Sequence, residues 1–392
     1  MSKLITNTIR HTGGSADNIT LDNSQNVTVE GNLTVDGTTT ITGYHPTTSR
    51  SNRNLVINGA MQVAQRGTSS TSDGYQAADR WWWGKYNTDQ LATTHSQVTD
   101  APEGFKNSYK IDVTTAETAL DSDEWGPIRY RIEGQDLQHL KTGTSNAVTT
   151  TLSFYAKTAS GNSGDTYSVC IVHGDSSGND RSQHRTFTPT STWQRFTMSF
   201  VGHTAISIRN DNDYGLQLFF ILAAGSSKVT SATTTWGTNG EKGVTGQSNF
   251  FDSTSNEFFV TGVQLEVGST ATDFEHLSYA DELVKCHRYY WKWVAGASYN
   301  CLGVGWAPNS SRFDTVIMFP QTMRASPSFS TGGSFRASTA TASPSITPTA
   351  ERTGNHTAYL RSSSISGLTA GEGGEYGANN DGSAYVAFDA EL

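Results

Sequence analysis

The sequence predicts an all-β fold, and three observations support this. Only 35% of the 392 residues are hydrophobic, and Gly, Ser, Thr and Asn are abundant. β-Branched Thr and Val favour strands, whereas Gly, Asn and Asp favour the turns between them. Short strand-like runs separated by turn-forming clusters also recur along the chain. In chain order we expect an N-terminal β-stem, a central jelly-roll β-sandwich, a short connecting helix and a small C-terminal β-sandwich.

A six-residue repeat occupies residues 26–43, which read NVTVEG, NLTVDG and TTTITG. Because six is an even number, equivalent positions lie on one face of an extended strand. A lone strand cannot bury an apolar face, so it needs partners, and the simplest are the same segments of symmetry-related copies. The alternative is an edge hairpin of the following domain. The apolar face consists of Val27, Val29, Leu33, Val35 and Ile41.

Composition divides the rest of residues 1–277 into three parts. We interpret residues 1–25 as an anchor segment, which is too short to fold independently. The polar stretch 44–53 is a linker, which assigns 26–53 to stem and linker. Residues 54–277 are expected to form one large sandwich. Its clearest strand-like runs are 149–157, 166–173, 193–200, 216–222 and 258–267.

Residues 278–293 (SYADELVKCHRYYWKW) predict a connecting helix. Ser278 can cap its N-terminus, and acidic residues in the first turn with basic residues later suit the helix dipole. A short apolar seam with coiled-coil spacing either meets symmetry-related copies or packs on the chain's own sandwich, and the sequence leaves both open. The seam consists of Tyr279, Leu283, Cys286 and Tyr290.

Charge and composition argue against several functions. The formal net charge is -9 and no Lys/Arg cluster exceeds two residues, so we expect no nucleic-acid partner. The chain has no run of about 18 apolar residues and its N-terminus lacks a signal-peptide core, so we expect no membrane insertion and no general secretion. The cysteines Cys170, Cys286 and Cys301 are interpreted as small buried side chains of a protein made in a reducing cytoplasm.

No residue pattern indicates a catalytic or metal site. His173, Asp175, Asp180 and His184 lie close in sequence but lack zinc spacing, so a solvated loop is favoured. Residues 210–213 (NDND) have a calcium-like composition without the Gly and terminal Glu of a calcium loop. Carboxylate pairs can be chosen freely, and none is diagnostic of glycoside hydrolysis. We therefore expect no catalytic residue and no cofactor.

Several motifs resemble those of bacteriophage tail fibres. A block at 258–290 ends in FEHLSYADELVKCHRYY, and together with four earlier motifs it is similar to a carbohydrate-binding-module-like jelly roll of the galactose-binding superfamily, as found in phage fibres. The segment FPQTMRASPSFS (319–330) resembles the FPxxMRxxP motif of small C-terminal domains on the same fibres. The four earlier motifs are NLVINGAMQVAQRG (54–67), ADRWWW (78–83), LSFYAKTAS (152–160) and TSTWQRFTMSF (190–200).

The resemblance implies a tail-fibre or receptor-binding protein that adheres to a host surface polysaccharide without catalysis. A homotrimer is implied by analogy with fibrous viral stems, giving an intertwined trimeric β-stem. The expected location is the virion tail, with the N-terminus bound to tail or adaptor proteins. Alternatives are a head fibre, a decoration protein or another structural virion protein, and a tailspike polysaccharide depolymerase. Related modules hold a structural calcium, but Thr261 stands where Asp is usual, which leaves Gln264 and Glu266 as weaker ligands.

Within this interpretation, residues 294–392 form the receptor-binding tip, and the loop 371–381 (GEGGEYGANND) is the main contact candidate. An ordinary solvated turn has the same composition. In the triple tryptophan, alternation puts Trp81 and Trp83 on one face and Trp82 on the other, so at least one face belongs to the core. The resemblance implies that Trp81 is the core residue, because ADRW is one of the motifs that carry it, and Trp82 is then a candidate glycan contact. The loop candidates are Tyr376, Asn379, Asn380 and Asp381, and the secondary candidates are Trp306, Tyr359 and Arg361.

Overall fold

A computed structural model describes residues 51–392 of the protein, except Asp89, residues 175–179, Asn239 and Glu241. Before residue 51 it describes only the backbones of three short strands. The chain divides into two compact units, residues 1–47 and 48–392. The three N-terminal strands are β1 (Thr8–Ile9), β2 (Ile19–Leu21) and β3 (Val27–Val29), and they form one antiparallel sheet.

Most of the predicted stem lies outside the described residues. This applies to Leu33, Val35 and Ile41. The backbones of Val27 and Val29 belong to β3, which pairs with β2 of the same chain. The trimeric stem therefore stays a prediction.

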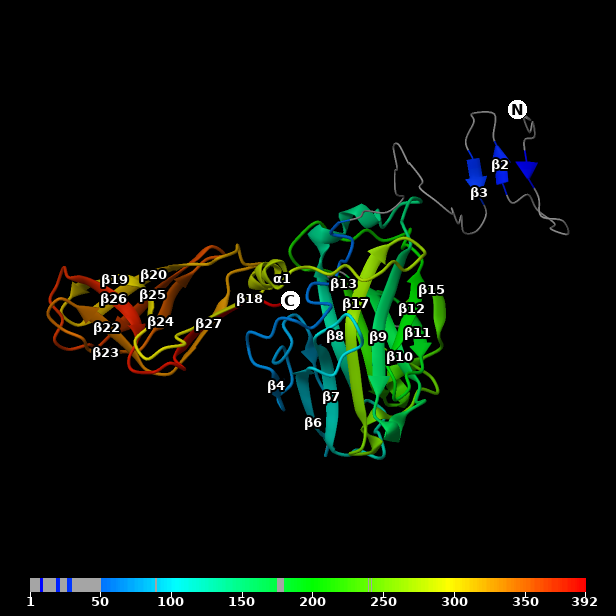
Figure 1. Ribbon diagram of the computed structural model, residues 1–392, viewed down its shortest axis with the longest axis horizontal. Coiled ribbons are helices and arrows are strands. Elements are labelled where there is room, and N and C mark those ends of the chain that lie inside the picture. The colour runs from blue at the N-terminus through cyan, green and yellow to red at the C-terminus, as the bar shows by residue number, and fades with distance from the viewer. Residues whose placement is uncertain are drawn as a thin grey trace, which may run out of the picture. The chain divides into compact units, whose positions relative to one another are not determined.

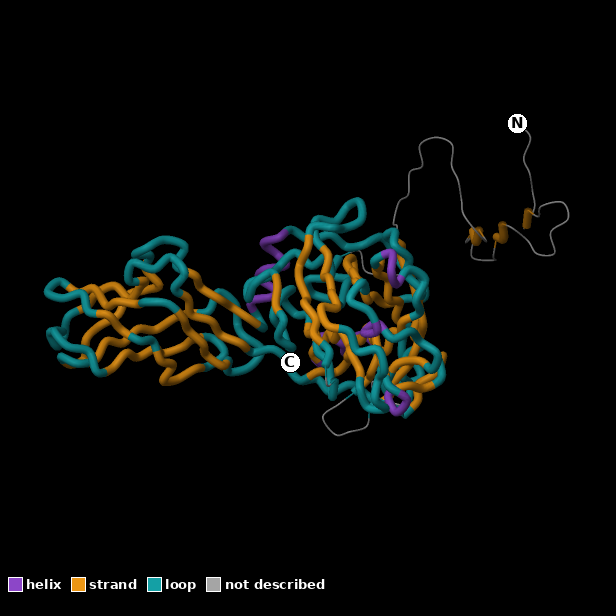
Figure 2. The backbone as a smooth tube through the Cα atoms, turned by 90° about the horizontal axis from the view of Figure 1, so that it is seen from below, coloured by secondary structure: helices purple, strands orange, loops and turns teal. Residues whose placement is uncertain are grey.

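Strands make up 44% of the structure and helices 7%, which confirms the all-β prediction (Figures 1 and 2). The central part is a β-sandwich of two antiparallel six-stranded sheets. The first sheet has the order β15 (Thr233–Gly237), β11 (Arg181–Phe187), β10 (Tyr167–His173), β13 (Tyr214–Ala224), β8 (Trp125–Glu133), β5 (Trp82–Trp83). The second has the order β12 (Gln194–Phe200), β9 (Thr150–Thr158), β17 (Glu257–Val267), β7 (Ser108–Thr115), β6 (Ala92–Val98), β4 (Ser69–Ser70).

Large aromatic side chains fill the space between the two sheets. Trp81 is fully buried, as the resemblance of the ADRW motif implied, and its ring centroid lies 4.9 Å from that of Tyr130. Its indole Nε1 donates a hydrogen bond to the carbonyl oxygen of Asn58 at 3.1 Å, so the polar edge of the ring is also satisfied. Phe154 and Phe220 pack edge to face at 4.9 Å in the same core. This core fixes which face of each sheet points outward.

A bulge interrupts β17 between Thr261 and Gln264. Gly262 has a φ of 60° there, and a Cβ atom at this position would lie 2.7 Å from the Phe105 ring. Only glycine fits both the left-handed backbone and the close approach. The side chain of Gln264 donates to Glu266 at 2.9 Å, and Glu266 accepts from the backbone of the following loop, so both residues brace that loop.

The helix is shorter than predicted. α1 spans Tyr279–His287, with the Ser278 hydroxyl accepting a hydrogen bond from the backbone N–H of Asp281. The end of the predicted helix instead belongs to strand β18 (Tyr290–Val294), because the bulky side chains of YWKWV favour a strand and this segment pairs with the C-terminal strand β27 (Tyr385–Asp389). The predicted helix over 278–293 is therefore wrong from residue 288 onward.

The helical seam packs on its own chain. Cys286 and Tyr290 are buried, and neighbouring Glu282 accepts a hydrogen bond from the backbone N–H of Asn58 at 2.7 Å. Tyr279, at the start of the seam, is 55% exposed. Of the two alternatives, the structure thus shows packing against the sandwich.

Two more sheets follow the helix and enclose a separate core. Buried Phe313, Phe335 and Phe388 are among its members. One sheet has the order β18, β27, β21 (Ser328–Gly332). The other has the order β23 (Ser345–Ile346), β22 (Phe335–Thr339), β26 (Gly373–Ala378), β19 (Cys301–Asn309), β20 (Arg312–Met318), β25 (Thr357–Ser363), β24 (Thr349–Thr353).

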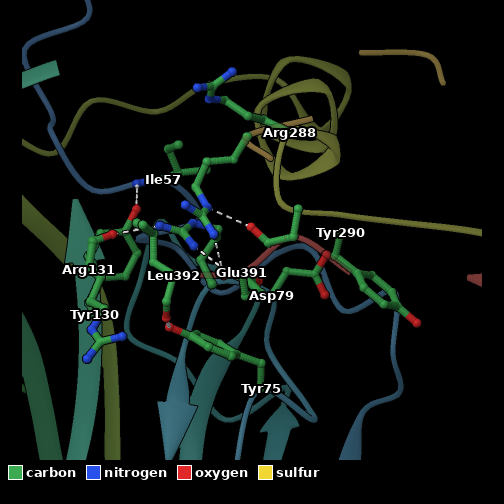
Figure 3. A network of polar contacts seen from close by, with 12 residues as sticks. Ile57, Tyr75, Asp79, Tyr130, Arg131, Arg288, Tyr290, Glu391 and Leu392 are labelled. Atoms are coloured by element: carbon green, nitrogen blue, oxygen red, sulfur yellow. Dashed lines mark hydrogen bonds and ion pairs between the residues drawn. The ribbon is translucent and has the colours of Figure 1, made fainter. Parts of the chain in front are cut away.

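A buried polar network ties the C-terminal residues to the sandwich (Figure 3). The Arg80 guanidinium pairs with the Glu391 carboxylate, donates to the carbonyl oxygen of Arg131 at 2.6 Å, and lies 3.4 Å from the ring centroid of Tyr289. Both Arg80 and Glu391 have side chains at most 5% exposed. A buried guanidinium is tolerated here because a carboxylate, a carbonyl and an aromatic face surround it.

Arg66 is surrounded in a similar way, by Glu391 and a second acidic residue. It pairs with Asp389 at 2.8 Å and with Glu391 at 3.4 Å, and it lies 3.6 Å from the ring centroid of Tyr290. Burial raises the pKa of neighbouring Asp79 to about 6, although the positive charge of Arg66 opposes that rise. The C-terminal residues are thus held by paired charges and not by apolar contacts alone.

Candidate functional site

Tyr376 is not a surface residue, so its prediction as a receptor contact is wrong. Its side chain is fully buried, because residues 373–378 form strand β26 and Tyr376 points into the C-terminal core. Its ring lies 6.1 Å from that of Phe313, and its hydroxyl lies 2.9 Å from the Ser362 hydroxyl. The glycine-rich composition of the segment had suggested a loop, but the glycines allow close packing of neighbouring strands.

The remaining loop candidates form a turn. Asp381 accepts hydrogen bonds from the backbone N–H of Ser334 at 2.8 Å and from the Ser383 hydroxyl at 2.6 Å, and the latter bond helps to lower its pKa. Asn379 donates to the Ser345 hydroxyl at 3.0 Å. Asn380 is exposed with a φ of 52°. These contacts are those of a stabilised turn, and only Asn380 points its side chain into open solvent.

The structure brings Trp306, Tyr359 and Arg361 together on the seven-stranded sheet. Trp306 and Arg361 both pair in register with Asp314, from opposite sides, and the rings of Trp306 and Tyr359 lie 6.1 Å apart. The polar groups are already engaged, because the Tyr359 hydroxyl donates to buried Asp314 at 2.6 Å and Arg361 pairs with Glu351 at 2.6 Å. The solvent-exposed side chains on this face of the sheet are mainly apolar. We call this the outer patch, and it comprises Val304, Trp306, Val316 and Met318, which are 41–76% exposed.

A second group of aromatic rings lies on the outer surface of the first sandwich sheet. Trp82 is half-buried there, because Trp81 and Trp83 on either side point into the core. Tyr86 lies 5.5 Å from Trp82 on one side and 5.1 Å from Trp125 on the other, with ring planes only 27° and 15° apart. We call these three rings the aromatic stack. Sequence analysis found Trp82 but neither Tyr86 nor Trp125, since they are brought together only by the pairing of the chain segments around β5 and β8.

A cavity of about 300 Å³ adjoins the aromatic stack. Arg129 lies beside Trp82 because the two residues pair in register on β8 and β5, and its guanidinium is 4.4 Å from the Trp82 ring centroid. The Lys228 ammonium lies 5.9 Å from the ring centroid of Trp125. The residues that line the cavity are Tyr86, Asn87, Trp125, Arg129, Phe219 and Lys228.

The lining has the composition of a binding surface. None of these described lining residues is a carboxylic acid, so the carboxylate pair that most glycoside hydrolases use is not part of the lining. They provide flat apolar walls, an amide and two cations. The Asn87 amide donates to the Asp123 carboxylate at 2.8 Å, which fixes the rim of the cavity. An aromatic wall with a few convergent polar groups is typical of a site for a small polar ligand or a sugar ring.

Other candidate chemistry is not assembled into a site. Among residues 51–392, apart from the omitted positions, no group of three or more His, Cys, Asp and Glu could hold a metal ion, and Asp175 lies outside the described residues. His173 packs against His203, with ring centroids 4.8 Å apart.

No helix in the described part of the chain has the length and apolarity needed to span a membrane.

The cysteine prediction is partly wrong. Cys170 and Cys286 are buried as expected, but Cys301 is exposed. Cys301 is the first residue of β19, and it lies at the exposed end of that strand.

Comparison with known proteins adds no family. No family model and no curated protein matches the chain. Among solved structures, the chain matches a sugar-binding protein from Bacteroides thetaiotaomicron at 14% identity and a TM-score of 0.31, covering 55% of this chain and 100% of that one. It matches a CBM4 structure at 13% identity and a TM-score of 0.29, covering 54% and 98%.

The chain also matches the enzymatically active domain of tailspike protein 4 from bacteriophage CBA120, at 14% identity and a TM-score of 0.31. That match covers 55% of this chain but only 22% of the tailspike domain. TM-scores this low do not support a conclusion about function.

Proposed function

We propose that the protein is a non-catalytic adhesin that binds a cell-surface glycan at the cavity beside the aromatic stack. The single observation that carries this proposal is the cavity lining: aromatic walls from Tyr86 and Trp125 with the polar groups of Asn87, Arg129 and Lys228. Sugar rings have apolar C–H faces that pack on aromatic side chains, and hydroxyl groups that need hydrogen-bonding partners. The lining offers both.

The scaffold supports this assignment. Trp125 begins β8, and Tyr86 follows β5 and pairs with Trp125 through backbone hydrogen bonds. Both strands pack on a core of fully buried side chains, so the aromatic groups need little ordering when a ligand binds. Trp82 borders the cavity through its stacking with Tyr86. Its direct contact with a glycan stays a prediction.

We further propose that this adhesin is a phage tail-fibre protein that acts as a homotrimer. The motifs at 258–290 and 319–330 and the hexad repeat at 26–43 support this assignment. Three linked copies would raise retention on a repetitive polysaccharide by avidity, without a strong individual site. The N-terminal residues would attach to tail or adaptor proteins. A head fibre or decoration protein with the same binding site is the alternative, and imaging of labelled virions separates the two.

Binding to purified surface polysaccharide of the host, measured by biolayer interferometry, tests the site. The full-length chain is compared with Trp125→Ala and with Trp193→Ala, a half-buried control tryptophan that directly precedes β12 of the second sandwich sheet. We expect Trp125→Ala to weaken binding at least about tenfold, since stacking contacts of this kind contribute one or more kcal/mol, and Trp193→Ala to leave binding unchanged.

Trp306→Ala tests the competing location on the outer patch. Loss of binding in Trp306→Ala alone would move the site to the C-terminal sheet and contradict the cavity assignment. If neither Trp125→Ala nor Trp306→Ala reduces binding, both locations are excluded.

A polysaccharide depolymerase is the alternative from a different class, and one observation bears on it. A cavity of about 400 Å³ beside α1 is lined by Asp136 and His139, among others. Burial, together with the nearby negative charge of Glu133, raises the pKa of Asp136. We expect no new reducing ends when the protein is incubated with the polysaccharide. Production of reducing ends that disappears in Asp136→Asn would establish the enzyme instead.

A further inference from the structure

Two cations at the cavity have no counter-ion among the residues that the structure describes. Arg129 and Lys228 form no ion pair there, and each lies near an aromatic ring, Arg129 at Trp82 and Lys228 at Trp125. Several other arginines, among them Arg66, Arg80 and Arg288, pair with at least one carboxylate. Two cations without such a pair thus line one cavity of a chain whose formal net charge is -9.

Arg129 is also incompletely hydrogen-bonded. Its Nε atom is buried without a hydrogen-bond partner. The residue stands between Trp82 on β5 and Phe219 on β13, with which it pairs in register, so its side chain is confined between apolar groups. Buried donors are almost always hydrogen-bonded in folded proteins, to protein or to water, so Arg129 retains donor capacity beside the cavity.

Lys228 is placed at the cavity by a tightly docked turn. The backbone N–H of Ser227 donates to the carbonyl oxygen of Ser122 at 2.8 Å, and the Ser227 hydroxyl donates to the same oxygen at 2.6 Å. At Gly225 a Cβ atom would lie 2.0 Å from the carbonyl oxygen of Asp121, so the close approach of the two segments requires glycine. The lysine is therefore carried on a fixed backbone and not on a free loop.

From these observations we propose that the glycan bound in the cavity is acidic, with a sugar carboxylate received by the Arg129 guanidinium and neighboured by the Lys228 ammonium. This inference rests on the proposed function of the cavity. A guanidinium donates parallel hydrogen bonds to both oxygens of a carboxylate, and the aromatic walls exclude water from the pair. The nearby Asp123 carboxylate is exposed at the rim and is hydrogen-bonded to Asn87, so it leaves both cations available. The ligand class is thus a uronic acid or another carboxylated sugar.

The test uses the full-length chain and matched probes: oligogalacturonate and the same oligosaccharide after chemical reduction of its carboxylates. Affinity is measured by isothermal titration calorimetry. We expect the acidic form to bind at least about tenfold more tightly, which is the effect of one charge-assisted contact. The preference should fall as salt is raised, because the Lys228 contribution is partly exposed to solvent.

Three variants assign the effect. Arg129→Gln and Lys228→Gln should each reduce the preference for the acidic probe, while Lys106→Gln, at an exposed lysine in the turn before β7, should leave it unchanged. Lys228→Gln serves if Arg129→Gln does not fold. Retained binding of both probes with no preference, abolished by Trp125→Ala, would overturn the acidic ligand while the glycan site stands. Acid preference unaffected by Trp125→Ala and by both cation variants would overturn the cavity itself.

Discussion

At the scale of single residues, the most demanding feature is the burial of Arg80. Removing a guanidinium from water is unfavourable unless its charge and its donors are matched. Glu391 supplies the charge and the carbonyl oxygen of Arg131 supplies an acceptor, so the C-terminal end of the chain completes the polar interior of the sandwich. The two residues are separated by most of the sequence, which makes this contact a sensitive indicator of correct folding.

Substituting Glu391 should therefore destabilise the sandwich as well as the C-terminal sheets. Glu391→Gln leaves Arg80 buried without a carboxylate, and we expect the free energy of unfolding in urea to fall by about 3–5 kcal/mol. Asp389→Asn is the control, because the Asp389 side chain is 40% exposed and should contribute about 1 kcal/mol or less. Equal losses in the two variants would contradict the role assigned to the buried pair.

Asp79 should give the fold a measurable pH dependence. Burial raises its pKa in the folded state to about 6, above the value of 3.8 expected when unfolded. The folded state then binds the proton more readily, so this group adds stability as pH falls from about 6 to about 4 and loses that contribution as pH rises through 6.

Urea titrations between about pH 4 and 7 test this dependence. The difference between wild type and Asp79→Asn should shift in favour of wild type as the pH falls. Asp121→Asn, at an exposed aspartate, is the control and should show no such trend. A difference that is constant with pH would show that Asp79 does not titrate in this range.

Sequence patterns predict individual residues where a motif and strand alternation agree. Trp81 is the successful case: alternation separates it from Trp82, and the ADRW motif indicates which of the two sides is buried. Tyr376 is the failure, since local glycine content indicated a turn while pairing with β19 and β22 created a strand. Arg129 and Lys228 carry no local signal at all. Their significance comes from the absence of counter-ions around them, which depends on the tertiary arrangement.

At the scale of elements, the boundary between α1 and β18 shows how pairing overrides helical spacing. Residues 288–293 continue the apolar periodicity of the helix, yet Tyr290–Val294 pairs residue by residue with the C-terminal strand. No local pattern shows that these residues pair with the distant strand β27. The beginning of the helix was predictable because the Ser278 cap is a local interaction.

The cap provides a direct test of this element. Ser278→Ala removes the hydrogen bond to the backbone N–H of Asp281, and we expect a loss of about 1 kcal/mol in the free energy of unfolding. Ser278→Asp can make the same contact and should retain most of the stability. If Ser278→Ala has no effect, the helix is held by the packing of Cys286 and Glu282 alone.

At the scale of the whole molecule, the proposed adhesion should depend on the number of linked copies. We expect native mass spectrometry of the full-length protein to give three times the 42.3 kDa of one chain. Replacing Leu33 and Val35 together by Asp should break up the trimer, since charges cannot be buried along the shared apolar face. Adsorption to cells should then fall about a hundredfold through loss of avidity, while the affinity of the single site for an oligosaccharide is unchanged. A wild-type protein that is a stable single copy would contradict the fibre proposal.

The most direct test of the central claim is a crystal structure of the protein with a bound acidic oligosaccharide. The account predicts a sugar ring packed against Trp125, with its carboxylate within hydrogen-bonding distance of Arg129. Sugar density only at the outer patch around Trp306, with the cavity beside the aromatic stack empty, would contradict it.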